Sequence, residues 1–555
     1  MKIRFILLLS VLLGFTFSCK NDNTKQETSE PIAVREWKPE DTRALAGVTE
    51  KRGLISKTDM ATPGYILFSP SFGTDTYLMN LDGEIVHKWH GELNTMLSSY
   101  LMENGNLIRL ERDPDFPTFA FGGQAGVIRE YDWDGNLLWN FKLANANELI
   151  HHDIEIMPNG NVLAINYKVR TPEESIAAGR DPERVLKAGL WIDKIIEIKP
   201  TKPEGGEIVW EWDMWDHLIQ DIDSTKANYG VIKDNPRKIN INTFSSEAEG
   251  GPLMNEEQIE QMKKMAAMTS NATVDNQRSD ITHVNAVSYN PELDQIVFSS
   301  PGFSEVYIID HSISTQEAKG PAGDLLYRWG NPRNYGRGTE ADQKLFGQHD
   351  VKWIPKGYPG EGHLIVYDND VPNPNNKLHS LGEALMAAQS PDPHVAIGDF
   401  GNYSMIDEWV LPKIENGTYP ISDNTAFGPS ETYWEYMAPD KYSLYSPFIS
   451  GVQRMKNGNT LITAGIKGQF MEVTPDKKTV WEYWNPYMDN YKLPDGTWPQ
   501  PVGPFIYAQF RSTHFDLDFP AFNGKALKPI EPQPEPFIFK MPPPPPPAQE
   551  NDSIH

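Results

Sequence analysis

The feature that most constrains the fold of this chain is a pair of short sequence patterns that recur along it. The first pattern is a strand, a turn and a second strand that ends in aromatic residues, as in TYLMNLDGEIVHKW. Asp-Gly and related turns between alternating apolar runs are typical of β-hairpins. Six copies are present, at 76–89, 127–141, 194–212, 306–329, 404–436 and 470–483.

A second hairpin pattern, built around a Gly or Asn turn, follows the copies of the first. HHDIEIMPNGNVLAI is an example. A sixth copy can be assembled from GYILFSP at 64–70 and FIYAQF at 505–510, which would join the two ends of the chain. The five clear copies lie at 97–110, 151–165, 282–300, 348–368 and 449–465.

Together the two patterns predict an all-β fold, a six-bladed β-propeller with insertions. Two hairpins make a four-stranded antiparallel sheet, and six such sheets in series form a propeller. Pairing the first and last segments in one blade would close the ring without an open edge. The longest insertion, about 213–280, contains a predicted helix within 255–270. A β-sandwich is the alternative fold, but six aromatic-ended repeats argue against it.

The N-terminus predicts export. Lys2 and Arg4 precede an apolar stretch that is shorter than the roughly 20 residues a membrane span needs, so residues 1–18 read as a signal peptide. Cys19, the only cysteine, follows directly and resembles a lipobox cysteine that becomes acylated. The alternative is an ordinary signal peptide with an incidental cysteine. We expect a lipoprotein at the periplasmic or cell-surface face of the outer membrane, held to the membrane only by its anchor.

These boundaries divide the chain into four parts. A polar tether and N-terminal extension (19–61) follows the signal peptide, the propeller occupies 62–522, and 523–555 forms a Pro-rich tail that we expect to be disordered. The oligomeric state is left open. The formal net charge is −26, from 76 acidic and 50 basic residues, which makes nucleic acid an improbable partner.

Three histidines occupy the same position in three consecutive copies of the second pattern. They are His152, His283 and His349, where other copies have Ser450 or Leu97. If this strand is the innermost of each blade, the three imidazoles converge on the central channel. A single histidine at a strand start is usually a packing residue, but three at one repeat position indicate function. They could ligate a transition metal, or one could be a nucleophile while the others bind an anion. The remaining histidines, among them His217 and His514, we expect in loops or at the surface.

At these residues the chain resembles the bacterial aryl-sulfate sulfotransferase family, over roughly 62–522. The resemblance rests on ordered motifs that include LIHHDIEIMPNGN, THVNAVSYNPELDQIVFS, FGQHDVKWIPKG and FISGVQRMKNGNTLI. It implies a six-bladed enzyme without cofactor or metal that moves a sulfuryl group from an aryl sulfate to a phenol through sulfohistidine, with no nucleotide donor. By motif, His349 inherits the nucleophile role, and His283, Asn285 and His152 would bind sulfuryl oxygens.

The chain departs from the family pattern at one charged position. Pro301 stands where the family has an arginine at the end of the strand after His-x-Asn. Arg454 and Arg511, which lie next to repeat positions, are the candidates to replace its charge. Two other functions stay open: a non-catalytic propeller lipoprotein that binds glycans or proteins, and a quinone-dependent dehydrogenase, whose usual eight blades and Ca²⁺ disagree with six repeats and a histidine ring.

Overall fold

The structure is a computed structural model that describes residues 52–537 except 72, 96, 114–117, 121, 247–252, 265–269, 373–401, 440–442 and 489–506. The predicted signal peptide 1–18, the lipid attachment residue Cys19 and the end of the tail lie outside these residues. Within the described part of the chain, no helix is long and apolar enough to cross a membrane.

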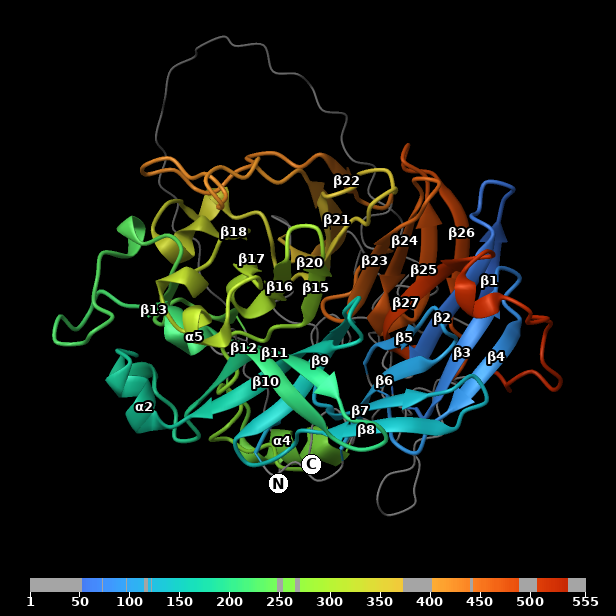
Figure 1. Cartoon of the computed structure of the whole chain (residues 1–555), viewed down its shortest axis with the longest axis horizontal. Coiled ribbons are helices and arrows are strands. Elements are labelled where there is room, and N and C mark those ends of the chain that lie inside the picture. The colour runs from blue at the N-terminus through green and yellow to red at the C-terminus, as the bar shows by residue number, and fades with distance from the viewer. Residues whose placement is uncertain are drawn as a thin grey trace, which may run out of the picture.

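Six antiparallel sheets are arranged in a ring, which confirms the predicted six-bladed β-propeller (Figure 1). Blade 1 contains β27 (Gln509–Asp516), β2 (Gly64–Pro70), β3 (Asp75–Asn80) and β4 (Ile85–His90). Blade 2 contains β5 (Ser99–Leu101), β6 (Leu107–Arg112), β7 (Gly126–Tyr131) and β8 (Leu137–Lys142). Blade 3 contains β9 (Glu148–Ile156), β10 (Val162–Arg170), β11 (Leu190–Pro200) and β12 (Gly206–Asp213).

The second half of the ring repeats this order. Blade 4 contains β15 (Ala286–Asn290), β16 (Gln295–Ser300), β17 (Glu305–Asp310) and β18 (Tyr327–Trp329). Blade 5 contains β19 (His349–Trp353), β20 (Leu364–Val371), β21 (Tyr403–Trp409) and β22 (Trp434–Tyr436). Blade 6 contains β23 (Ser450–Arg454), β24 (Thr460–Ala464), β25 (Gln469–Val473), β26 (Thr479–Trp484) and an added outer strand, β1 (Gly53–Lys57).

The two ends of the chain share blade 1 and close the ring, as predicted, but the C-terminal strand is β27 at 509–516 and not the predicted segment 505–510. β27 pairs antiparallel with β2, with Tyr65 opposite Phe515. The second sequence pattern supplies the two inner strands of each blade and the first pattern the two outer ones. The innermost strands β9, β15, β19, β23 and β27 contact one another around the channel. Side chains at the start of these strands therefore meet at the centre of the ring.

The aromatic residue that ends each outer hairpin explains how neighbouring blades are joined. In every blade an outer-strand tryptophan donates its indole N–H to a backbone carbonyl in the outer turn of the next blade. The last of these bonds, from Trp481 to the carbonyl of Leu81 at 2.9 Å, links blade 6 back to blade 1. The other five donors are Trp89, Trp139, Trp210, Trp329 and Trp434.

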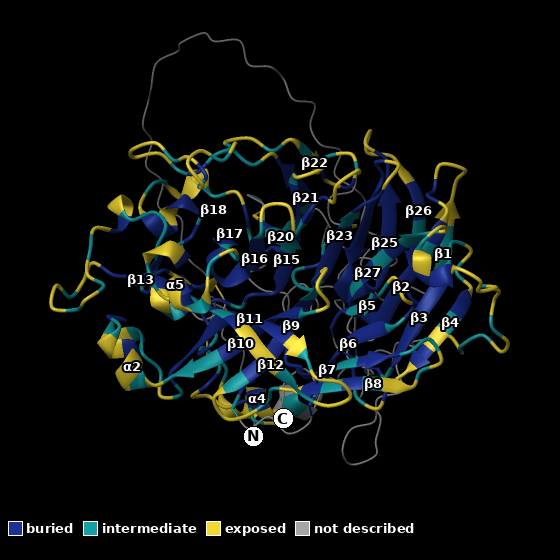
Figure 2. Cartoon of the chain, in the orientation of Figure 1, coloured by how far each residue is buried: buried dark blue, intermediate teal, exposed yellow. Residues whose placement is uncertain are grey.

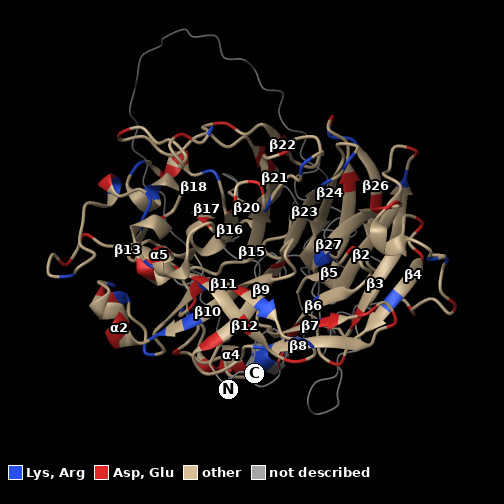
Figure 3. Cartoon of the chain, in the orientation of Figure 1, with Lys and Arg blue, Asp and Glu red and all other residues tan. Residues whose placement is uncertain are grey.

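The core lies between the blades, and the insertions lie outside the ring. Buried strands are concentrated toward the centre, whereas exposed residues and both signs of charge lie mainly on the outer strands and loops (Figures 2 and 3). The predicted insertion helix is present as α4 (Glu256–Lys264). The remaining short elements are α2 (Pro172–Ala177), α5 (Thr315–Ala318) and the parallel pair β13 (Leu218–Ile219) and β14 (Ile239–Asn240).

Part of the segment assigned to the tail binds back to the propeller. The amide of Ile530 donates to the carbonyl of Ile85 at 2.9 Å, and Gln533 bonds both backbone groups of Ile85. The amide of Phe537 donates to the carbonyl of Pro486 at 2.9 Å. Residues 523–537 thus run along blades 1 and 6, while 538–555 lie outside the described residues.

Candidate active site

The structure brings His152, His283 and His349 together at the channel. His152 lies in β9, His283 just before β15, and His349 opens β19. The rings of His152 and His283 are edge to face, with centroids 4.4 Å apart. Phe510 of β27 lies 6.2 Å from the His152 ring and 6.5 Å from the His349 ring. Three blades therefore supply the imidazoles, and a fourth supplies an apolar wall.

Irregular backbone turns these side chains into the channel. In β9, Ile154 pairs with Ala164 and His151 with Ile165, so His152 and Asp153 bulge out of the ladder. His152 and His283 have φ values of 53° and 51°, which are unusual for residues other than glycine. Such strain costs on the order of 1–3 kcal/mol per residue and clusters at functional sites, which supports a functional role for both histidines.

A glycine pair packs against two of the rings. A Cβ atom on Gly123, whose φ is 73°, would lie within 2.2 Å of atoms of the His152 imidazole. A Cβ atom on Gly122 would lie 3.4 Å from the His283 ring. The amide of His152 also donates to the carbonyl of Gly123 at 2.8 Å. The segment can approach the histidines this closely only because it carries no side chains at these two positions.

His349 is held as a neutral imidazole with a defined orientation. Its Nδ1 lies 3.1 Å from the Gly347 carbonyl and 3.0 Å from Asn369 Oδ1. Asn369 Nδ2 donates to the Ser446 carbonyl at 2.6 Å, which fixes Oδ1 toward the histidine. Both groups facing Nδ1 are acceptors, so Nδ1 carries the proton and Nε2 carries the lone pair. Burial, followed by the nearby His283, lowers the pKa of His349 to about 3.

His152 is buried beside a second histidine that the sequence-based prediction did not include. Its Nδ1 lies 2.7 Å from Nδ1 of His151, and His151 Nε2 lies 2.7 Å from Asp193 Oδ1. Burial is the main cause that lowers the pKa of His152 well below its usual value, followed by His283, His151, His349 and Arg511. Burial also lowers the pKa of His151. Both rings are therefore neutral near pH 7.

His283 is paired with a carboxylate three residues earlier. Its Nδ1 lies 2.5 Å from Asp280 Oδ2, and its amide donates to Asp280 Oδ1 at 2.9 Å. The Tyr167 hydroxyl donates to the same Asp280 Oδ2 at 2.5 Å. Burial would raise the pKa of Asp280, but His283, Tyr167 and His151 together outweigh burial and lower it. Asp280 is thus a carboxylate that fixes the position and orientation of His283.

Arg511 is the predicted arginine that the structure places beside the histidines. Its Nη1 donates to Asp153 Oδ2 at 2.6 Å, its Nε lies 3.0 Å from Asp350 Oδ1, and its Nη2 donates to the Asn285 carbonyl at 2.9 Å. Burial disfavours the charge, but Asp153 and Asp350 outweigh it and keep the pKa of Arg511 above its usual value. Its positive charge contributes to the low pKa of His152 and His349.

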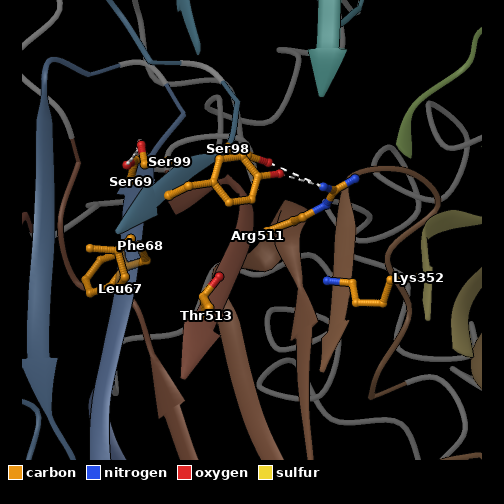
Figure 4. A pocket seen from close by; sticks show the side chains of 9 residues that line it. Leu67, Phe68, Ser69, Ser98, Ser99, Lys352, Arg511 and Thr513 are labelled. Carbon is orange, nitrogen blue, oxygen red and sulfur yellow. Dashed lines mark hydrogen bonds between the residues drawn. The ribbon is translucent and has the colours of Figure 1, made fainter. Parts of the chain in front are cut away.

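A small pocket of about 30 Å³ adjoins Arg511. Figure 4 shows the Arg511 side chain directed toward Ser98, with Lys352 on its other side. None of the three histidines lines this pocket. Its polar lining consists of Arg511, Lys352, Tyr100, Thr513, Ser69, Ser98 and Ser99.

The other two predicted binding residues have structural partners. Asn285 Nδ2 donates at 3.0 Å to the carbonyl of Gln348, the residue before His349, while its Oδ1 is buried without a hydrogen bond among the described residues. Arg454 is not brought to the histidines: its guanidinium bonds Glu408 at 2.5 Å and the Pro359 carbonyl at 3.1 Å. Pro301 opens a buried 3₁₀ turn, Pro301–Phe303, after β16.

Several site residues were missed from the sequence. Each of these residues contacts one of the three histidines, or contacts a residue that does: they are His151, Asp193, Asp280 and Asn369. The doubled histidine of the HHD motif was the one signal of them in the sequence, and it points to His151. The expectation of loop or surface positions was wrong for His217 and His514, which are buried. Among the described residues, no group of three or more His, Cys, Asp or Glu side chains is placed to hold a metal ion.

Fold and site together define a six-bladed propeller with a buried histidine cluster on its axis. The family model described as Arylsulfotransferase (ASST) matches residues 56–486, most of the chain. The chain therefore belongs to the arylsulfotransferase family, and this membership supports a sulfotransferase enzyme. The match ends before β27, which carries Arg511.

Comparisons with other proteins add little. A search of curated proteins finds no match to the chain. Among solved structures, a protein of unknown function from Bacteroides caccae is 12% identical, with a TM-score of 0.37, and covers 81% of this chain and 98% of its own. A virginiamycin B lyase from Staphylococcus aureus is 10% identical (TM-score 0.32, 78% and 88% covered). A periplasmic gluconolactonase from Pseudomonas aeruginosa is 10% identical (TM-score 0.33, 76% and 96% covered). Such low TM-scores establish nothing about this chain's function.

Proposed function

We propose that this protein transfers a sulfuryl group from an aryl sulfate to a phenolic acceptor through a sulfohistidine at His349, without a nucleotide sulfate donor. The observation that carries this proposal is the state of His349. Its Nδ1 proton is directed at Gly347 and Asn369, so the Nε2 lone pair is free for attack, and no hydrogen bond among the described residues engages Nε2.

The first step balances without any other reactant. Nε2 of His349 attacks the sulfur of the aryl sulfate, an N–S bond forms, and the S–O bond to the ring breaks with its electron pair on the departing phenolate. In the second step a phenol oxygen bonds to the sulfur and gives up its proton to a base, while the N–S bond breaks and its electron pair returns to Nε2. The two half-reactions split one transfer into two steps, which gives ping-pong kinetics.

The surroundings of His349 suit the charge that moves. A sulfuryl group resembles a phosphoryl group in that positioning and electrostatic stabilisation supply most of the catalysis. Arg511 supplies a positive charge beside the histidines, where it binds Asp153 and Asp350, and we assign His283 to the sulfuryl oxygens. His152 and His349 are only 2% and 4% exposed, so a substrate can reach them only if part of the site opens.

Mass spectrometry of protein treated with 4-nitrophenyl sulfate in the absence of acceptor tests the proposal. We expect a burst of nitrophenol, one added sulfuryl group, and a peptide map that places it on His349. His349→Ala should abolish both, whereas His87→Ala, a histidine at the outer edge of blade 1, should retain them. With a phenol present, double-reciprocal plots should be parallel. Binding without turnover or label would instead favour the non-catalytic propeller.

The metal alternative has its own test. A cluster of three histidines that ligates a transition metal would lose activity when the metal is removed. We expect the nitrophenol burst to survive dialysis against a chelator, because His349 acts through its free lone pair. Loss of the burst with recovery on adding a metal would replace the nucleophile mechanism.

We also propose that the protein is exported and anchored by lipid on Cys19. The support is the sequence alone: a short apolar segment between Lys2 and Cys19, followed by a polar tether. Cys19→Ala should move the protein from the membrane fraction to the soluble fraction and remove labelling by a fatty-acid analogue. Labelling that persists in the variant would contradict the anchor, and surface proteolysis of intact cells would distinguish the two faces of the outer membrane.

A further inference from the structure

We infer that Asp193 and His151 fix the proton of His152 on Nδ1, so that His152 Nε2 is the base that accepts the proton of the incoming phenol. This inference rests on the proposed function and assigns its second step. His151 and Asp193 are positioning residues, since they act through His152. The assignment differs from the sulfuryl-binding role that the family resemblance implies for His152.

The chain of contacts begins at Asp193, whose two oxygens have different partners. Oδ2 accepts a hydrogen bond from the Val284 amide at 3.0 Å and another from the Thr282 hydroxyl. Oδ1 lies 2.7 Å from Nε2 of His151, a close polar contact whose angle is too bent for a regular hydrogen bond. A lone pair on Nε2 would be repelled by the carboxylate at this distance, so the proton of His151 is favoured on Nε2.

The position of that proton determines the next one. A neutral imidazole carries one N–H, so His151 with a proton on Nε2 has a lone pair on Nδ1. Nδ1 of His152 lies 2.7 Å from that lone pair and must supply the proton of this bond. His152 therefore has a lone pair on Nε2, and the low pKa of both rings keeps them neutral.

Packing prevents His151 from reversing this order by a ring flip. His151 is 0% exposed and stacks on Tyr167, with ring centroids 3.4 Å apart and planes 2° apart. The Tyr167 hydroxyl is itself bonded to Asp280, the partner of His283. The ring of His151 is thus held in place by stacking on Tyr167 and by its polar contacts with His152 and Asp193.

The chemistry of the second step needs such a base. A simple phenol has a pKa of about 10 and reaches the site with its proton. As the phenol oxygen bonds to sulfur, its proton passes to His152 Nε2, and the N–S electron pair returns to His349. His152 then releases the proton to solvent. An acceptor that arrives as a phenolate has no proton to lose and does not need His152.

Asp193→Asn is the test, because it reverses the direction of proton donation from Asp193 through His151 to His152 without changing the shape of the side chain. The bonds from Val284 and Thr282 keep the Asn carbonyl at the Oδ2 position, so its NH₂ faces His151 Nε2 and donates. His151 must then carry its proton on Nδ1, and His152 must carry its own on Nε2, which removes the base. Asp324→Asn, which changes the separate, partly buried pair His217–Asp324 at 2.9 Å, is the matched control.

The measurement is a chase of preformed sulfo-enzyme with acceptors of different acidity, followed by intact mass. For Asp193→Asn we expect sulfo-enzyme to form at the wild-type rate from 4-nitrophenyl sulfate. Its discharge by un-ionised phenol should be more than tenfold slower than in the wild type. Discharge by a nitro-substituted phenol, assayed as its anion, should match the wild type. Asp324→Asn should match it with both acceptors.

A second pair of variants keeps the inference testable if Asp193→Asn does not fold. His151→Phe keeps an aromatic ring stacked on Tyr167 but removes the contacts that connect Asp193 to His152. It should therefore show the same acceptor-selective loss. His151→Gln, which can accept from His152 and donate to Asp193, should restore much of the discharge rate. Equal loss with both acceptors, or no loss, would overturn the inference. Absence of sulfo-enzyme in the wild type would instead overturn the proposed function.

Discussion

Asp153 and Asp350, which lie in different blades, make the same two kinds of contact. Asp153 Oδ2 accepts from the amide of Val287 in blade 4 at 3.1 Å, and Asp350 Oδ2 accepts from the amide of Val452 in blade 6 at 2.7 Å. Both aspartates bind Arg511. Each follows a histidine of the cluster, so one guanidinium fixes the backbone that presents His152 and His349.

This arrangement predicts a large loss of stability when Arg511 is removed. Arg511→Met leaves two buried carboxylates without their shared cation, and breaking a buried ion pair in this way costs about 3–5 kcal/mol. Urea unfolding should show this decrease in the free energy of unfolding. Lys356→Met, which breaks an exposed pair with Glu292, should change it little. Equal effects of the two variants would contradict the structural role of Arg511.

The repeat pattern was enough to predict the blades and their closure. Alternating apolar residues fix which face of a strand is buried, and the aromatic at the end of each outer hairpin marks the tryptophan that bonds the next blade. Segments without a repeat could not be placed from the sequence. β1, which adds a fifth strand to blade 6, and the segment around Ile530 have no periodic pattern that distinguishes them from a linker.

The site was predictable only where it followed the repeat. His152 and His349 align by their HD motifs, yet the positive φ falls on His152 in β9 and on Asp350 in β19. The two bulges differ in length, and local sequence does not encode bulge length. Asn369 lies on β20, beside β19, and Asp193 lies on β11, two strands away from β9, so their contact with a histidine depends on register across the sheet.

Replacing Asn369 should have a moderate effect on the rate of the first half-reaction. Asn369→Leu removes one acceptor that holds the Nδ1 proton of His349, while the Gly347 carbonyl remains. A hydrogen bond contributes about 0.5–1.5 kcal/mol, so the burst rate should fall up to about tenfold with little change in donor KM. Asn334→Leu, a buried asparagine in blade 4, is the control in rapid-quench experiments. A full loss of the burst would indicate a larger role for Asn369 than orientation.

The pH dependence of the burst reports the state of His349. Only the neutral imidazole attacks sulfur, and its pKa is lowered to about 3 by burial and by His283. The neutral form therefore predominates at every pH well above this value. Rapid pH-jump measurements should give a burst rate that is flat from about pH 5 to pH 8 and falls only in more acidic solution. A half-maximal rate near the ordinary histidine pKa of about 6.5 would show that His349 is not held neutral.

Replacing Glu155, near the C-terminal end of β9, should have a stability effect whose size depends on pH. Burial and then Asp153 raise its pKa to about 8, although Lys352 and Arg511 oppose the shift. Between the unfolded value of about 4.3 and the folded value, the unfolded chain releases this proton and the folded protein keeps it. The contribution of Glu155 to stability is therefore fully present below about pH 4.3 and is lost as the pH rises to about 8.

Glu155→Gln removes this dependence, so the variant should gain stability over the wild type as the pH rises. Urea unfolding of both proteins at about pH 4.5 and pH 8 measures this gain, and a difference that is the same at both pH values would show that Glu155 ionises normally in the folded protein.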